Sequence, residues 1–169
     1  APTRGWLYRI WLVVIVGGRG SRGRMLFVPP RLWPPVGTVL FVCVENTFRS
    51  VLSEAIFNAR APSGWRAESA GVQAASSINP VVMDLLGEIG IELGSKTPRQ
   101  VTPVMVDRAW RVVTFGCLDR CPIGAKDKSD DWPLPGATGK TMEELRGIRD
   151  ELARRIDGLI AEIRRSKGS

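Results

Sequence analysis

Residues 39–50, VLFVCVENTFRS, pass from a strand pattern to a helical pattern within one short segment. Apolar residues lead up to Cys43, five residues separate Cys43 from Arg49, and a helical repeat of apolar residues follows Ser50. A strand, a tight loop and a helix in this order are typical of the βα unit of a parallel sheet. The segment therefore predicts an α/β domain with a loop at the carboxyl end of its first strand.

The loop from Cys43 to Arg49 has the length and the residue types of an oxyanion-binding loop. Its backbone N–H groups can surround one tetrahedral anion, and the following helix N-terminus contributes about half a positive charge. The planar guanidinium of Arg49 can bind two oxygens of phosphate or arsenate. Asn46 tolerates the left-handed backbone that a tight loop needs, and Ser50 can donate to a Cys43 thiolate. The predicted oxyanion-binding residues are Val44, Glu45, Asn46, Thr47, Phe48, Arg49 and Ser50, with Cys43 as the nucleophile.

A Cys-x5-Arg spacing is only weakly specific by itself. A cysteine at the end of a strand is more often a buried apolar residue than a nucleophile. Here the spacing lies between a strand and a helix over 50–60, with an Asn inside the loop and an Arg-Ser pair at its end. This context favours the anion-binding interpretation over that of a core cysteine.

The segment CVENTFRS at 43–50, followed by ESAGV at 68–72, resembles the low-molecular-weight protein tyrosine phosphatase superfamily, and most closely its thioredoxin-coupled arsenate reductase branch. The resemblance runs from about Thr38 to the C-terminus and includes Asn79-Pro80 ahead of a helical segment. Glu45 departs from it, because it stands where the family loop usually has Gly. The resemblance implies the fold of this superfamily and a site that binds arsenate or phosphate.

Strand-like and helical segments alternate from residue 38 onward, which is typical of βαβ units around a parallel sheet. Together with the resemblance, this alternation predicts a three-layer α/β fold with a four-stranded parallel sheet and helices on both faces. The predicted strands are 39–42, 65–69, 110–115 and 131–134. The predicted helices are 50–60, 79–89, 103–108 and a long amphipathic helix that begins at a capping box of Thr141 and Glu144.

The positive charge of the chain is concentrated in its first 36 residues. The formal net charge is +7, but residues 1–36 hold six Arg and no acidic residue, whereas the remainder holds 18 Lys or Arg against 17 Asp or Glu. Because the remainder is nearly neutral, nucleic acid is not expected as a partner. We predict a basic, Pro/Gly-rich N-terminal extension at 1–36 and a phosphatase/arsenate reductase-like domain at 37–169. The apolar run at 6–16 is shorter than the roughly 20 residues of a membrane span, so no membrane association is expected.

The chain has three cysteines and no histidine. The lack of histidine excludes Ser-His and Cys-His catalysis and any histidine-ligated metal site. A small, odd number of cysteines fits a reducing, cytoplasmic compartment better than a secreted disulfide framework. Two further thiols cannot complete a tetrahedral zinc site, so neither a metal nor a cofactor is expected.

Cys117 and Cys121 lie in the loop after the third predicted strand. Because the carboxyl ends of parallel strands lie at one edge of a sheet, this loop and Cys43 are expected to share a crevice. A thiol–disulfide relay accounts for the three cysteines: Cys43 attacks arsenate, Cys117 attacks the Cys43 sulfur and releases arsenite, and Cys121 resolves the disulfide for a thioredoxin-like reductant. The resemblance to thioredoxin-coupled arsenate reductases implies the same order.

Phosphatase chemistry is the competing interpretation on the same scaffold. Cys43 and Arg49 would form a cysteinyl-phosphate, and a carboxylic acid would protonate the leaving group of phosphotyrosine, a step worth about 10²- to 10⁴-fold. Gly136-Ala137 stands where the family has its general-acid Asp-Pro, which leaves Asp130 or Asp131 as candidates. Arsenate reduction is favoured, because it depends less on the missing acid: water or hydroxide leaves arsenate readily. A non-catalytic thiol-redox or anion-binding regulator is the third interpretation.

Overall fold

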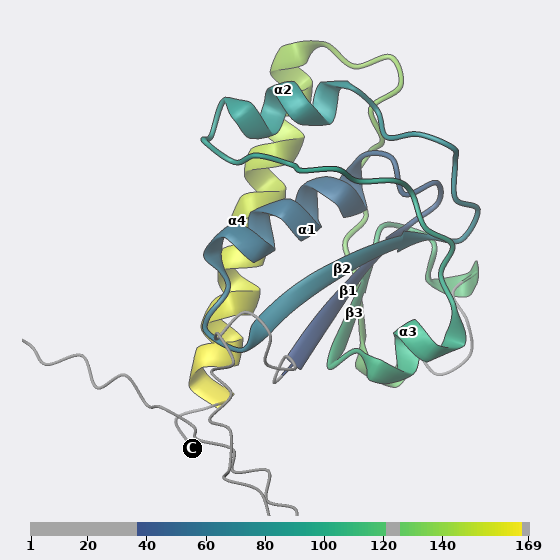
Figure 1. The fold of residues 1–169 in the computed structure, drawn as a ribbon, viewed down its shortest axis with the longest axis vertical. Coiled ribbons are helices and arrows are strands. Elements are labelled where there is room, and N and C mark those ends of the chain that lie inside the picture. The colour runs from purple at the N-terminus through teal and green to yellow at the C-terminus, as the bar shows by residue number, and fades with distance from the viewer. Residues whose placement is uncertain (1–36, 121–125, 167–169) are drawn as a thin grey trace, which may run out of the picture. The chain divides into compact units, whose positions relative to one another are not determined.

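Four parallel strands form the sheet of the domain, in the order β2-β1-β3-β4 (Figure 1). The computed structural model describes residues 37–120 and 126–166. The strands are β1 (Gly37–Cys43), β2 (Trp65–Gly71), β3 (Arg111–Thr114) and β4 (Ser129–Asp131), and every neighbouring pair is parallel. The predicted four-stranded parallel sheet is thereby confirmed, and the carboxyl ends of its strands lie at one edge.

The central strand β1 is buried on both faces. Its side chains alternate between two hydrophobic clusters, with Val39, Phe41 and Cys43 in one cluster and Leu40 and Val42 in the other. A strand covered on both sides needs an uninterrupted apolar run, which explains why residues 39–42 carry no polar residue.

Helices cover both faces of the sheet, as predicted. The helices are α1 (Arg49–Arg60), α2 (Val81–Gly87), α3 (Pro103–Arg108) and α4 (Met142–Ser166). Figure 1 shows α1, α2 and α4 on one side of the sheet and α3 on the other, so that the sheet is the middle of three layers. The predicted capping box is present at the start of α4: the Thr141 N–H donates to the Glu144 carboxylate (2.8 Å), and the Glu144 N–H donates to the Thr141 hydroxyl (3.3 Å).

Most predicted strands and helices differ from the structure by one or two residues at an end, and the fourth strand and the second helix differ most. The fourth strand ends at Asp131 instead of spanning 131–134, because Pro133 has no backbone N–H and the Leu134 N–H turns back to the Trp132 carbonyl (2.8 Å). The second helix begins after Pro80 and ends at Gly87, so the predicted helix over 79–89 is too long.

An ion-pair cluster joins the end of α2 to α4. The Glu88 carboxylate accepts hydrogen bonds from Arg146 (2.8 Å) and from Arg149 (2.6 Å), and Arg149 also donates to the Leu85 carbonyl (3.2 Å). These hydrogen bonds lower the pKa of Glu88 to about 2. Glu88 therefore stabilises the folded state wherever it is ionised.

Replacement of Glu88 by Gln is expected to lower the melting temperature at pH 7. A carboxylate whose pKa is lowered by folding contributes stability above its unfolded pKa of about 4.3 and loses that contribution as the pH falls toward about 2. The difference between wild type and Glu88→Gln should therefore shrink in thermal melts between pH 5 and pH 3. Glu92→Gln, an exposed site with the same change of charge, is the control. A difference that is constant over this pH range would contradict the assignment.

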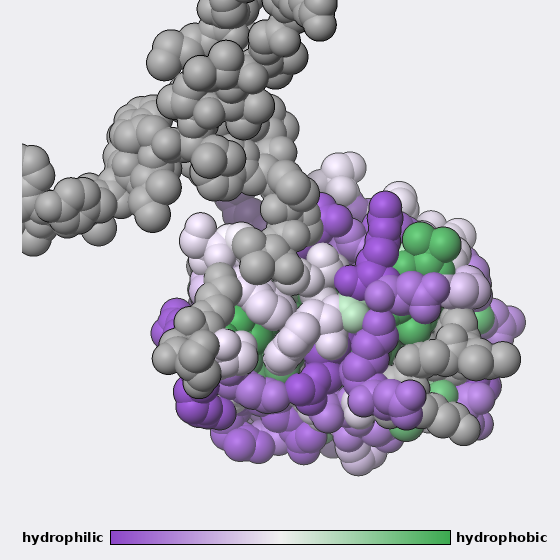
Figure 2. Space-filling model, turned by 90° about the horizontal axis from the view of Figure 1, so that it is seen from below, coloured by the Kyte–Doolittle hydropathy of each residue, from purple (hydrophilic) through white to green (hydrophobic). Residues whose placement is uncertain are grey.

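Hydrophobic side chains of the described residues lie mainly in the two clusters. Figure 2 shows one face on which these residues are mostly hydrophilic and the hydrophobic ones form small separate spots. Met83 and Val104 are the large hydrophobic residues classed as exposed in the described ranges. None of the described helices has the length and apolar composition needed to span a membrane. The predicted extension at 1–36 lies outside the described residues, so the division at residue 36 stays a prediction.

Candidate active site

The loop after β1 folds around the sulfur of Cys43. Asn46 has the left-handed backbone conformation, with φ 57°, and its N–H donates to the Cys43 Sγ (3.2 Å). The Ser50 Oγ lies 2.9 Å from the same sulfur. Cys43 and Ser50 are both buried. The backbone role expected of Asn46 and the contact expected of Ser50 are thus present in the structure.

The side chain of Asn46 ties this loop to two other segments. Its Nδ2 donates to the Ser50 Oγ (2.8 Å) and to the Ser69 Oγ on β2 (2.9 Å). Its Oδ1 accepts from the backbone N–H of Arg99 (2.9 Å). Both N–H groups of the amide donate and its oxygen accepts, so Asn46 fixes the loop against β2 and the chain before α3.

The hydrogen-bonded chain continues beyond Ser69. The Ser69 hydroxyl donates to the Glu54 carboxylate on α1, and the same carboxylate accepts from Lys96. The pair of Glu54 and Lys96 is largely buried, with side chains 17% and 14% exposed. No sequence pattern marks Glu54 or Lys96 as part of the site. Ser69 is marked only by its position within the family-like segment ESAGV at 68–72.

Gly71 allows the loop after β1 to pass close to β2. A Cβ atom at this position would lie 2.7 Å from the Val44 carbonyl oxygen, 2.8 Å from the Asn46 nitrogen and 2.9 Å from the Glu45 carbonyl carbon. These are backbone atoms of the anion loop, so they cannot move aside without moving the loop itself.

Gly71→Ala is therefore expected to displace the loop and to reduce oxyanion affinity and turnover, by about 10²-fold for a shift near 1 Å. The measurement is the affinity for phosphate together with the rate of the reaction proposed below. Gly147→Ala is the matched control, because nothing lies within 4 Å of its added Cβ in α4. The control is expected to keep full affinity and to gain about 0.5–1 kcal/mol of stability. Unchanged affinity in Gly71→Ala would show that the loop does not depend on this close approach.

Arg49, the first residue of α1, reaches the loops that follow β3 and β4. Its Nη1 donates to the Phe115 carbonyl (3.2 Å) and to the Leu134 carbonyl (2.6 Å). Its guanidinium carbon lies 5.9 Å from the centre of the Phe115 ring. Arg49 therefore joins the loop after β1 to the segments that follow β3 and β4, as expected for parallel strands whose carboxyl ends lie at one edge of the sheet.

Cys117 packs in the smaller hydrophobic cluster, next to the carboxyl end of β1. It is completely buried, and its thiol donates to the Val42 carbonyl on β1 (3.3 Å). Burial raises the pKa of Cys117, and the neighbouring Cys43 adds to this increase. The structure thus brings the second predicted cysteine to the site as a protonated thiol. Cys121 lies outside the described residues.

Both aspartates considered as substitute acids have other partners. Asp130 accepts from Arg111 (2.8 Å), and the Asp131 carboxylate accepts from the Thr114 hydroxyl (2.6 Å) and from the Gly116 N–H (2.7 Å). These bonds connect β4 to β3 and hold the carboxylates as acceptors. Neither aspartate has the arrangement of a free general acid.

The remaining residues of the loop are divided between surface and interior. Glu45 is exposed, Val44 and Thr47 are half-buried, and Phe48 is buried in the larger hydrophobic cluster. The exposed position of Glu45 accounts for a carboxylate where the family has Gly.

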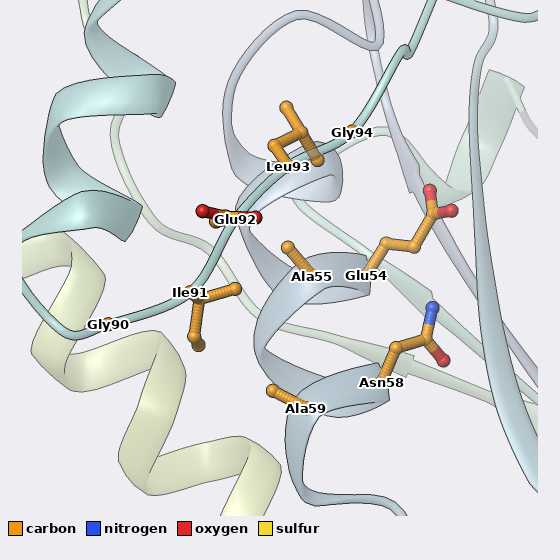
Figure 3. Close-up of a pocket in the computed structure, with 9 residues that line it drawn as sticks. All are labelled: Glu54, Ala55, Asn58, Ala59, Gly90, Ile91, Glu92, Leu93 and Gly94. Carbon is orange, nitrogen blue, oxygen red and sulfur yellow. The ribbon is translucent and has the colours of Figure 1, made fainter.

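A groove of about 420 Å³ lies between α1 and residues 90–94 (Figure 3). Two of its polar side chains already have partners: Asn58 exchanges hydrogen bonds with the backbone of Ala67 (2.7 and 3.1 Å), and Glu54 binds Lys96. None of the predicted oxyanion-binding residues lines this groove, although Glu54 belongs both to it and to the hydrogen-bonded chain of the Cys43 loop.

Known proteins with related sequences and structures include reductases and phosphatases. Residues 38–119 match the sequence model described as Low molecular weight phosphotyrosine protein phosphatase. A candidate arsenate reductase from Halobacterium salinarum is 30% identical over 131 residues, which cover 72% of this chain and 89% of that protein.

Two solved structures have the same fold at moderate identity. A thioredoxin-dependent arsenate reductase from Corynebacterium glutamicum superposes with a TM-score of 0.68 at 32% identity, covering 80% of this chain and 66% of that one. An arginine phosphatase from Geobacillus stearothermophilus superposes with a TM-score of 0.69 at 28% identity, covering 78% of this chain and 95% of that one. The chain therefore belongs to the low molecular weight phosphotyrosine protein phosphatase family.

Proposed function

We propose that the protein is an arsenate reductase that uses Cys43, Cys117 and Cys121 in a thiol–disulfide relay. The observation that carries the proposal is the second thiol: Cys117 is buried, and it donates a hydrogen bond to the carbonyl of Val42, the residue before Cys43. Phosphate hydrolysis does not require a second thiol, whereas the reductase needs one to attack the Cys43 sulfur and release arsenite. Relatives that are named as arsenate reductases support the same assignment.

The proposed reaction begins at the Cys43 loop. The Cys43 thiolate attacks the arsenic of arsenate, an S–As bond forms, and one arsenate oxygen leaves as hydroxide or water. Backbone N–H groups of the loop and the guanidinium of Arg49 stabilise the charge on the remaining oxygens. Ser50 donates to the sulfur before the attack.

The second step transfers two electrons to arsenic. Cys117 loses its proton and its sulfur attacks the Cys43 sulfur, so that an S–S bond forms and the S–As electron pair leaves with arsenic as arsenite. Two sulfurs are oxidised and one arsenic is reduced. Cys121 then exchanges with this disulfide, and a thioredoxin-like reductant reduces the resulting Cys117–Cys121 bond. This chemistry fits a reducing, cytoplasmic environment.

Phosphatase activity is the second candidate, favoured by the family and by the structural similarity to an arginine phosphatase. The same Cys43 and Arg49 would form a cysteinyl-phosphate. Against it, Gly136 carries no acid, and both Asp130 and Asp131 are engaged in other hydrogen bonds. The non-catalytic regulator remains as the outcome in which neither reaction occurs.

The test measures both reactions on the same preparation. Purified full-length protein is supplied with arsenate, thioredoxin, thioredoxin reductase and NADPH, and separately with an aryl phosphate. The proposal expects sustained arsenite formation and only slow release of phenol. Rapid phenol release without arsenite would establish the phosphatase, and the absence of both products would leave an oxyanion-binding or redox regulator.

Gly136→Asp is expected to increase hydrolysis of an aryl phosphate by about 10²-fold or more, because it adds an acid where the resemblance implies one. The position accepts a side chain, since nothing lies within 4 Å of its added Cβ. Gly136→Asn has nearly the same shape without an acid and is the control. Release of phenol at equal rates by the two variants would show that this position does not reach the leaving group.

A further inference from the structure

Two prolines determine the conformation of Leu134. The Leu134 N–H donates to the Trp132 carbonyl (2.8 Å), which makes a three-residue turn centred on Pro133. Proline fixes φ near −65°, close to the value of about −75° that such a turn requires at its centre. Pro135 in turn restricts Leu134 to an extended conformation. The direction of the Leu134 carbonyl is therefore set by its neighbours in the chain.

The segment 132–135 is also anchored at its start. The Trp132 N–H donates to the Thr114 carbonyl (2.8 Å). The indole ring is buried, with its centre 6.0 Å from that of Phe41 and 6.3 Å from that of Phe115. An anchored tryptophan followed by two prolines leaves this segment little freedom.

The Leu134 carbonyl accepts the shorter of the two hydrogen bonds from Arg49, at 2.6 Å against 3.2 Å for the Phe115 carbonyl. Among the described residues both bonds leave from Nη1, so Nε and Nη2 keep their N–H groups for the two-oxygen grip on an oxyanion. An arginine side chain has much rotational freedom to lose on binding. A carbonyl that already holds the guanidinium removes part of that loss beforehand.

We propose that Leu134 is a positioning residue for oxyanion binding: its carbonyl, aimed by Pro133 and Pro135, holds Arg49 ready to bind arsenate. The inference rests on the proposed function for the identity of the anion. It gives the segment 132–135 a role in this chain, although the adjacent Gly136 lacks the acid that the family resemblance implies.

The test measures how well inorganic phosphate protects Cys43 from alkylation by iodoacetamide, scored on the Cys43 peptide by mass spectrometry. Protection of Cys43 from alkylation reports even weak phosphate binding, and it does not depend on turnover. In Pro135→Ala and Pro133→Ala the phosphate dissociation constant is expected to rise about three- to tenfold. Pro62→Ala, between α1 and β2 at the opposite edge of the sheet, is the control and should bind phosphate as the wild type does. Thermal melts of each variant identify any general loss of folding.

A double-mutant cycle with Arg49→Lys separates positioning from a merely structural effect. If the prolines act through the guanidinium, Pro135→Ala should change the phosphate affinity of Arg49→Lys protein little or not at all. Equal losses in the Arg49 and Lys backgrounds, or no loss in either proline variant, would overturn the inference. Wild-type Cys43 that neither phosphate nor arsenate protects would overturn it as well. Protection that follows the expected pattern without arsenite formation would refute the reductase and leave the positioning role intact.

Discussion

Cys43→Ser protein is expected to lose arsenate turnover by roughly 10³-fold or more while keeping its fold. A serine hydroxyl is far less nucleophilic than a thiolate, and no histidine exists in the chain to activate it. The hydroxyl can still accept from the Asn46 N–H and contact Ser50, so the loop should keep its shape. The measurements are the rate of arsenite formation and the melting temperature of both proteins.

Retention of activity in Cys43→Ser would move the chemistry to another residue. A loss of activity accompanied by a large drop in melting temperature would not count as support, because the fold would then be at fault. Phosphate-induced stabilisation of the folded variant provides the control for an intact oxyanion site.

Cys117→Ala is expected to stop repeated arsenate turnover, by roughly 10²-fold or more, while any hydrolysis of an aryl phosphate continues. Without the Cys117 thiol, no sulfur is in place to attack the Cys43 sulfur and break its S–As bond. Cys117 is buried, so its truncation also costs packing. Val106→Ala, in the same hydrophobic cluster, is the control for that cost and should keep its turnover.

The proposed order of the relay separates Cys117 from Cys121. Cys121→Ala is expected to complete one turnover and then stop with a Cys43–Cys117 disulfide, whereas Cys117→Ala should release no arsenite. Full turnover with thioredoxin in either variant would contradict the three-cysteine relay.

The fold was predictable where local patterns are strong. Thr102 caps a helix whose first residue is Pro103, and the structure has α3 over the expected 103–108. The apolar run before Cys43 became the central strand. The fourth strand could not be located correctly, because its three residues, Ser129–Asp131, are polar and show no alternation. Short edge strands depend on their neighbours more than on their own sequence.

The candidate site was predictable only in its local part. The Cys43 loop and its contacts with Ser50 lie within eight consecutive residues, where spacing carries information. The Asn46 bonds to Ser69 and Arg99 span 23 and 53 positions, and the Arg49 bond to Leu134 spans 85. The last of these uses a backbone carbonyl, which every residue possesses and no sequence pattern marks.

The central claim is that the reducing electrons come from thiols of this chain, and a single-turnover measurement tests it most directly. Fully reduced wild-type protein, freed of external reductant, is mixed with arsenate, and arsenite, free thiols and the bridged peptides are quantified. The proposal predicts about one arsenite per chain, the loss of two thiols for each arsenite, and a disulfide that contains Cys117. An undiminished thiol count with no arsenite, from protein that binds the oxyanion, would contradict it.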